Sequence, residues 1–439
     1  MDRIPLEIAT MIVENLLIYD LAPGPNSEYT DQPSDKLVPY GERKEDMVPI
    51  WVLFTQGARL DLLNARLSCR SLYDASMKSF ATILGDRPFR FTEVGTKDLR
   101  AIGQDARLTP YITTLTIGCT GFQNAANLDL GTIKHVVNNL DHGTQARLMR
   151  SYGARVKWQH EKLPIFAKIF AVLLRQFPKL ETVRLDQEDL TTHLGGWLEP
   201  GDEDLLHRWG YLFRKKDEED RSCFGYGYPF NLYKSCFGPA DLLGVLSHPR
   251  LGIRDLRISG HLVPPFIQTM NFSKLRTLRL PLSRPAWFHG ISLKLDIELL
   301  VDRLRKMPNL EDLSLNLQSG VRESSAGVLA ALNKNQNLRR VSLTGPWNIT
   351  QQALIRFLTT HTLSLRCLIL EGSTLWGSWR TILNTISGLP RGTLQFFRAQ
   401  CVMSIAPDGQ ERHENITEVD LASLSCLIEW VPHFAPPQT

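Results

Sequence analysis

The sequence lacks a marked excess of charge and long uncharged apolar runs. Its 439 residues include 50 Lys and Arg against 46 Asp and Glu, a formal net charge of +4. That balance is far too even for a nucleic-acid binder or a polybasic membrane attachment. No uncharged run is long enough to span a bilayer, and the apolar run at residues 8–21 contains Glu14 and Asn15 and no small-residue cleavage site. We therefore expect a cytoplasmic or nuclear protein without a signal peptide, which binds neither nucleic acid nor membrane.

Closely spaced cysteine pairs are also lacking. The seven cysteines are scattered over the chain, and no pair has the spacing of zinc ligands or of a redox motif. Free, mostly buried thiols in a reducing compartment are the expected state. The sequence therefore predicts neither a metal site nor a cofactor.

The motifs of common catalytic sites are missing as well. There is no Gly-x-x-x-x-Gly-Lys phosphate loop, and His160 and His413, each followed by Glu, lack the second histidine of a zinc protease helix. No nucleophile-elbow sequence places a serine at a strained turn. We expect no catalytic residues and no enzyme. One alternative stays open, an unrecognised site in residues 187–250, which would need a deep pocket with converging ionisable groups.

What the sequence does contain is a recurring pattern, Leu-x-x-Leu-x-Leu. It occurs at residues 310–315, 338–343 and 365–370, with Val341 as the one replacement, and successive copies begin 28 and 27 residues apart. This spacing is typical of leucine-rich repeats, in which each unit adds one strand and one helix to a shared core. Related patterns begin at Ile112, Leu180, Ile253, Leu275 and Leu394. The sequence thus predicts an α/β solenoid of horseshoe form.

Residues 1–80 have a different composition. Residues 4–16 repeat an apolar residue every four positions and predict an amphipathic helix, with Pro5 and Glu7 in its first turn. Residues 22–58 are expected to contain a loop insertion rich in Pro, Gly, Ser and Asp. A second helix is predicted at residues 61–73, with apolar side chains on two faces, so it needs two surfaces to bury against.

Three segments of this head resemble an F-box. They are residues 5–8 (Pro-Leu-Glu-Ile), 61–63 (Asp-Leu-Leu) and 66–72 (Arg-Leu-Ser-Cys-Arg-Ser-Leu), in the order usual for that family. An F-box followed by leucine-rich repeats is a known combination. The head departs from the family pattern by its insertion, by Ser68 where Val is common, and by Leu72 where an aromatic residue is common.

The resemblance implies a small all-α head that docks on the Skp adaptor of a cullin-RING, SCF-type ubiquitin ligase. The rest of the chain would then capture a protein to be ubiquitinated. The residues that match the docking motif are Pro5, Leu6, Ile8, Ile12, Leu62, Leu63, Leu67, Cys69 and Leu72. Two alternatives stay open: the helices only cap the open end of the solenoid, or the protein is a repeat scaffold unrelated to ubiquitination.

Target binding is expected where the repeat period fails or where polar and aromatic residues flank the strands. Residues 187–250 hold an aromatic-rich insertion, and insertions in solenoids often lie on the binding face, although packing on the solenoid itself is the alternative. The candidates are Trp197, Trp209, Tyr226, Tyr228, Trp347, Trp376 and Trp379. Further candidates, with a solvated surface as the alternative for the two arginines and packing for several tryptophans, are Arg257, Arg279, Trp287 and Asn316.

The predicted organisation therefore has three parts. Residues 1–80 form the F-box-like head, residues 81–402 the solenoid, and residues 403–439 an irregular C-terminal cap or tail. Within the tail, Leu421, Leu424 and Ile428 predict a short final helix that covers the last repeat.

Overall fold

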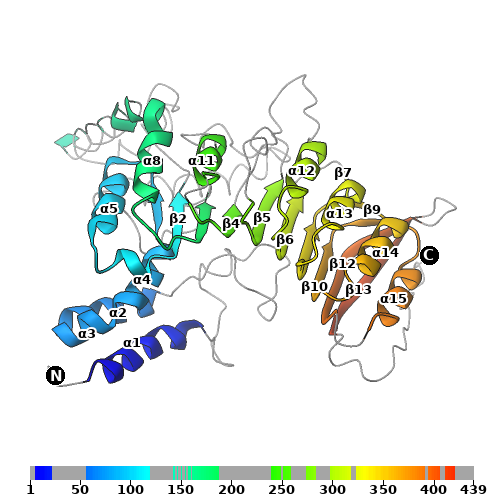
Figure 1. The fold of residues 1–439 in the computed structure, drawn as a ribbon, viewed down its shortest axis with the longest axis horizontal. Helices are drawn as coiled ribbons and strands as arrows, with labels where there is room; N and C mark the ends of the chain where they lie inside the picture. The colour runs from blue at the N-terminus through cyan, green and yellow to red at the C-terminus, as the bar shows by residue number, and fades with distance from the viewer. Residues whose placement is uncertain are drawn as a thin grey trace. The chain divides into compact units, whose positions relative to one another are not determined.

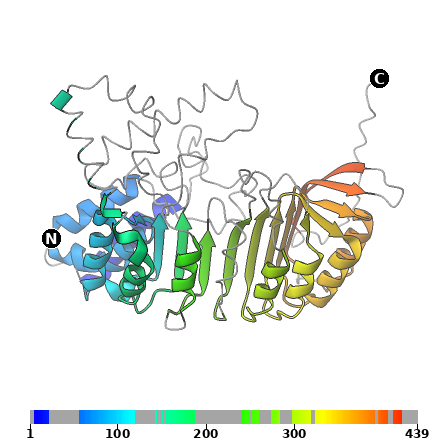
Figure 2. The same cartoon turned by 90° about the horizontal axis from the view of Figure 1, so that it is seen from above.

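The computed structural model describes two compact units of mixed α/β structure, Met1–Leu275 and Arg276–Thr439 (Figures 1 and 2). Parallel strands alternating with helices confirm the predicted α/β class. The boundaries predicted at residues 80 and 402 stay predictions. Besides isolated positions between 142 and 159, the described residues are 5–21, 56–118, 161–186, 239–248, 251–258, 273–282, 297–317, 323–390, 394–405 and 411–420.

The first unit begins with four helices. They are α1 (Leu6–Leu21), α2 (Gln56–Ser68), α3 (Arg70–Ala75) and α4 (Met77–Asp86). The helices predicted near residues 4–16 and 61–73 are thus present, but the second one is not continuous. Cys69 has extended backbone angles, φ −162° and ψ 164°, so it ends α2 and precedes α3. The predicted loop insertion lies outside the described residues, except for its last three positions, which belong to α2.

Four parallel strands follow within the first unit. They are β1 (Pro88–Arg90), β2 (Thr114–Gly118), β3 (Thr182–Asp186) and β4 (Asp255–Ile258), each paired with the next. Leu115, Val183 and Leu256 are aligned across β2, β3 and β4 and are buried. The alignment confirms the strands expected after Ile112, Leu180 and Ile253. The other described elements of this unit are α5 (Glu93–Gln104), the short 3₁₀ helices Thr109–Tyr111 and Leu163–Ile165, α8 (Phe166–Leu174) and α11 (Pro239–Leu246).

The second unit continues the same alternation. Its main strands are β5 (Thr277–Leu282), β6 (Asp312–Leu317), β8 (Arg340–Thr344), β10 (Cys367–Glu371) and β12 (Phe396–Ile405), parallel in this order. Leu280, Leu315, Leu343, Leu370 and Ala399 are aligned across them and are buried. On one side of these strands lie α12 (Ile297–Leu304), α13 (Ala326–Leu332), α14 (Gln351–Thr360) and α15 (Trp379–Ser387) (Figure 1).

Three shorter strands form a second parallel row that the sequence did not predict. They are β7 (Glu323–Ser324), β9 (Trp347–Thr350) and β11 (Thr374–Trp376), and the row joins β12 through β11. Glycines at 345 and 372, with φ of 92° and 65°, turn the chain from β8 into β9 and from β10 into β11. A side chain at Gly345 would overlap the carbonyl oxygen of Leu317, so glycine is required there.

An antiparallel strand, β13 (Glu411–Asp420), pairs with β12 in the second unit. The expectation of an irregular tail beyond residue 403 is therefore wrong for residues 411–420. Their charged sequence does not predict a strand, and the strand forms by backbone pairing with β12. The final helix predicted at Leu421, Leu424 and Ile428 lies outside the described residues. None of the described helices is both long and apolar enough to cross a membrane.

Candidate functional site

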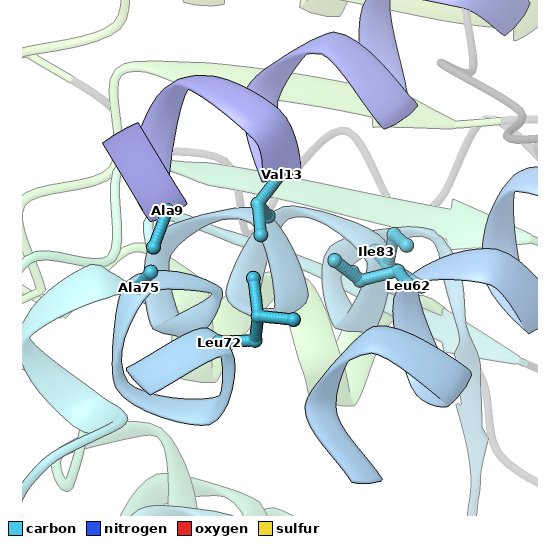
Figure 3. Close-up of a cluster of buried hydrophobic side chains, with 6 residues drawn as sticks. All are labelled: Ala9, Val13, Leu62, Leu72, Ala75 and Ile83. Atoms are coloured by element: carbon cyan, nitrogen blue, oxygen red, sulfur yellow. The ribbon is translucent and has the colours of Figure 1, made fainter. Parts of the chain in front are cut away.

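In the described side chains of helix α1, residues 6–13, small apolar side chains are buried and large ones are exposed. Ala9 and Val13, one turn apart, are fully buried, and Figure 3 shows them directed toward α3 and its neighbours. Small side chains allow a close approach between packed helices. Among these described side chains, the large apolar ones that stay exposed are Leu6, Ile8, Met11 and Ile12.

Helix α2 also exposes large apolar side chains, and to a greater degree than α1. Of its four leucines only Leu62 is buried, whereas Leu60, Leu63 and Leu67 are 50%, 38% and 85% exposed. Leu60, Leu63 and Leu67 follow a helical stripe, and Leu62 lies on a different face. Full burial of one leucine side chain is worth roughly 1.5–3 kcal/mol. Covering these three leucines with apolar surface would therefore be substantially favourable in free energy.

These exposed side chains are concentrated in one part of the described chain. Among the described residues, seven of the twelve exposed large apolar side chains belong to α1 and α2. A concentration of this kind marks interaction surfaces in folded proteins. The α1/α2 apolar set consists of Leu6, Ile8, Met11, Ile12, Leu60, Leu63 and Leu67.

A small core lies beneath the α1/α2 apolar set and joins four helices. Its buried members are Ala9, Val13, Leu62, Leu72, Ala75 and Ile83 (Figure 3). Ala65, Cys69 and Phe80 are partly buried and pack against them. This core holds α1 and α2 on α3 and α4 while their outer side chains stay in contact with solvent.

The predicted docking residues fall into two groups. Pro5, Leu6, Ile8, Ile12, Leu63 and Leu67 are exposed, whereas Leu62, Cys69 and Leu72 lie in or against the small core. Two members of the α1/α2 apolar set, Met11 and Leu60, did not match the sequence motif. Met11 lies on the helix predicted at residues 4–16, whereas Leu60 directly precedes the helix predicted at residues 61–73. A helical period alone does not say which face of a helix is covered.

The two arginine candidates beside the strands are buried in ion pairs, so the interpretation as a solvated surface is wrong. Arg257 Nη2 lies 2.6 Å from Asp255 Oδ2, and Arg279 Nη2 lies 3.1 Å from Asp312 Oδ2. Neither guanidinium is available for a separate molecule without loss of its carboxylate contact. Such a loss is strongly unfavourable for a buried charge.

The tryptophan candidates divide by exposure. Trp347 is buried and donates through Nε1 to the carbonyl oxygen of Thr344 at 3.0 Å, and buried Trp379 packs near Phe397. The packing alternative therefore describes these two. Trp376 is 49% exposed, with Nε1 3.4 Å from Asn348 Oδ1. Asn316 is half-buried, and Trp197, Trp209, Tyr226, Tyr228 and Trp287 lie outside the described residues.

A pocket of about 490 Å³ lies among α12, β7 and α13 in the second unit. Its lining combines apolar groups with two carboxylates and one guanidinium: Ile297, Glu298, Val301, Arg305, Glu323, Ser324 and Gly327. In the described parts of the chain, no group of three or more His, Cys, Asp or Glu side chains is placed to hold a metal ion. The alternative enzyme site at residues 187–250 lies outside the described residues apart from 239–248.

No protein-family model matches the sequence, and a comparison with curated proteins finds no match.

Proposed function

We propose that this protein is a substrate-recognition adaptor of an SCF-type ubiquitin ligase and works in the cytoplasm or nucleus. Helices α1–α4 would form a small all-α, F-box-like head that docks on a Skp adaptor. The strand and helix units would form a leucine-rich-repeat horseshoe that captures the target protein. The observation that carries the proposal is the exposure of Leu63 and Leu67, in the segments of α2 that resemble an F-box, together with that of Leu60 just before them.

Exposed leucines on an otherwise packed helix are best explained by a partner that covers them. Leu62, with partly buried Ala65 beside it, anchors the described part of α2 in the small core. A helix that only capped a solenoid would be expected to turn most of its apolar side chains inward, since the cap exists to cover apolar surface. The opposite orientation on both α1 and α2 favours docking over a simple cap.

The nine motif residues would then have two roles. The exposed ones, with Met11 and Leu60 added, contact the Skp adaptor directly. The interior ones, Leu62, Cys69 and Leu72, support the contact surface through the small core. At protein interfaces a small number of well-packed side chains carry most of the binding energy.

The helices are joined to the first strands without a long linker, which suits an adaptor. Helix α4 ends directly before β1, and Thr116 Oγ1 on β2 donates to the carbonyl oxygen of Gly85 at 2.6 Å. Arg87, after α4, forms an ion pair with Asp98 on α5. These contacts hold the first strands of this unit at a defined position relative to α4.

Mixing the purified protein with a Skp adaptor tests the proposal. The wild type is expected to co-elute with the adaptor, and Leu67→Asp is expected to abolish co-elution, because a carboxylate would be buried at the contact. Val172→Asp, at an exposed position on α8 of the same unit, is the matched control and should bind normally. Absence of binding by the wild type, or normal binding by Leu67→Asp, would contradict the proposal.

The alternative of a repeat scaffold unrelated to ubiquitination differs in one measurable way. Affinity capture with the wild type and with the double variant Leu6→Asp, Leu67→Asp separates the two. For an adaptor, ligase components are lost from the variant while target proteins are retained. For a scaffold, the two captures contain the same proteins.

A further inference from the structure

Helix α2 has a weak apolar attachment to the rest of the protein. Among the described side chains of α2, residues 60–68, Leu62 is the one buried large apolar side chain, and Ala65 is only partly buried. A helix held by one leucine can tilt at little cost in burial energy. Something else must hold the angle at which its exposed leucines stand.

Arg66 makes the additional contacts. Its guanidinium carbon lies 4.3 Å from the ring centre of Tyr73 on α3 and 4.0 Å from that of Phe80 on α4. Nη1 donates to Ser76 Oγ at 3.0 Å and lies 3.7 Å from Met77 Sδ. One side chain of α2 thus contacts α3, α4 and the residue between them.

Tyr73 extends these contacts to the turn that follows α5. Arg107 Nη2 donates to Tyr73 Oη at 3.1 Å, and the Arg107 guanidinium lies 5.3 Å from the Tyr73 ring centre. The Arg107 backbone N–H donates to Asp105 Oδ1 at 2.9 Å, which orders that turn. The four side chains Phe80, Arg66, Tyr73 and Arg107 form an arginine–aromatic stack.

We infer that Arg66 is a positioning residue: the arginine–aromatic stack holds α2 at the angle that presents Leu60, Leu63 and Leu67 to the partner. The inference rests on the proposed function, since it concerns the same docking surface. Arg66 follows Leu62 by four positions, and its guanidinium is turned toward Tyr73 and Phe80 of the neighbouring helices. Its effect on binding is therefore indirect.

The arrangement requires arginine rather than any cation. A planar guanidinium can stack between two rings and donate in its plane at the same time, whereas a lysine ammonium is a point charge without a plane. Burial lowers the pKa of Arg66, and the neighbouring Tyr73 partly offsets that effect. The group stays charged at neutral pH because an arginine pKa starts far above it.

Arg66→Lys tests the inference in the full-length protein, with Arg70→Lys, at an exposed position on α3, as the matched control. Affinity for the Skp adaptor is expected to fall about tenfold in Arg66→Lys, because the competent orientation of α2 is less populated. Hydrogen exchange of the α2 amides should accelerate, while the midpoint of global unfolding stays close to that of the wild type. Arg70→Lys should match the wild type in all three measurements.

Other results would overturn the inference in distinguishable ways. Unchanged affinity and unchanged α2 exchange in Arg66→Lys would remove any positioning role. Affinity lost together with global stability would reduce Arg66 to a general folding role. If the wild type itself does not bind the Skp adaptor, the proposed function fails. In that case the exchange measurement still decides whether the stack holds α2.

Discussion

Leucine has opposite surroundings in two regions of the molecule. In the second unit, Leu280, Leu315 and Leu343 lie side by side on neighbouring strands and are buried. On α2, Leu60, Leu63 and Leu67 also recur with a regular spacing, yet they are exposed. The strand leucines are buried against other side chains of their own unit, so they contribute to its core. The α2 leucines lack such contacts, and the proposed docking surface is built on them.

The largest expected effect comes from making the same substitution in both regions. Leu315→Ala should lower the free energy of unfolding by about 2–5 kcal/mol, because it leaves a cavity in a packed interior. Leu67→Ala should change it by less than about 0.5 kcal/mol, because that side chain is 85% exposed. Chemical denaturation of the two variants provides the measurement. Equal losses of stability would remove the distinction between the two regions.

A glycine pair tests how far the second unit depends on its turns. Gly345→Ala should destabilise the protein by about 2 kcal/mol or more, because φ is 92° and the new side chain meets the Leu317 carbonyl. Gly244→Ala is the matched control, since nothing lies within 4 Å of its added carbon and the residue is inside α11. Alanine is the better helix former, so this control should gain about 0.5–1 kcal/mol. A neutral Gly345→Ala would contradict the role given to that turn.

The main strands were predictable because each one carries its own signal. The residues around Leu313 and Leu315 alternate buried and less buried positions, which is the period of a strand with one covered face. Strands β7, β9 and β11 could not be predicted in the same way. They are two to four residues long and form by pairing with one another, and β9 and β11 follow turns at Gly345 and Gly372.

The candidate site was predictable only in part, for a related physical reason. The motif resemblance pointed to Ile8, Ile12, Leu63 and Leu67, which are exposed, but also to Leu62, which is buried. Periodicity places residues on a face of a helix, but the choice of the covered face depends on the neighbouring helices. The burial of Trp347 and the exposure of Trp376 likewise depend on tertiary packing that no local pattern contains.

The smallest expected effect is the pH dependence that one buried histidine of the second unit adds to stability. His361, at the end of α14, is buried against Phe357, with ring centres 4.8 Å apart. Burial lowers the pKa of His361, and a hydrogen bond with the Leu332 backbone partly offsets the effect. The unfolded chain therefore binds a proton at a higher pH than the folded chain does. The contribution of neutral His361 to stability is complete above the unfolded pKa of about 6.5 and declines as the pH falls below it.

The titration of His361 distinguishes α14 from α2, because residues 1–86, which include α2, contain no histidine. Lowering the pH from 7.5 to about 5.5 should reduce the unfolding free energy of the wild type, and His361→Phe should reduce that decline. Hydrogen exchange of the α14 amides should accelerate over the same range, whereas the α2 amides should follow only the pH dependence of intrinsic exchange. An identical pH profile for His361→Phe and the wild type would show that another group controls the acid response. Faster opening of α2 at low pH would instead mean that the two regions do not respond independently.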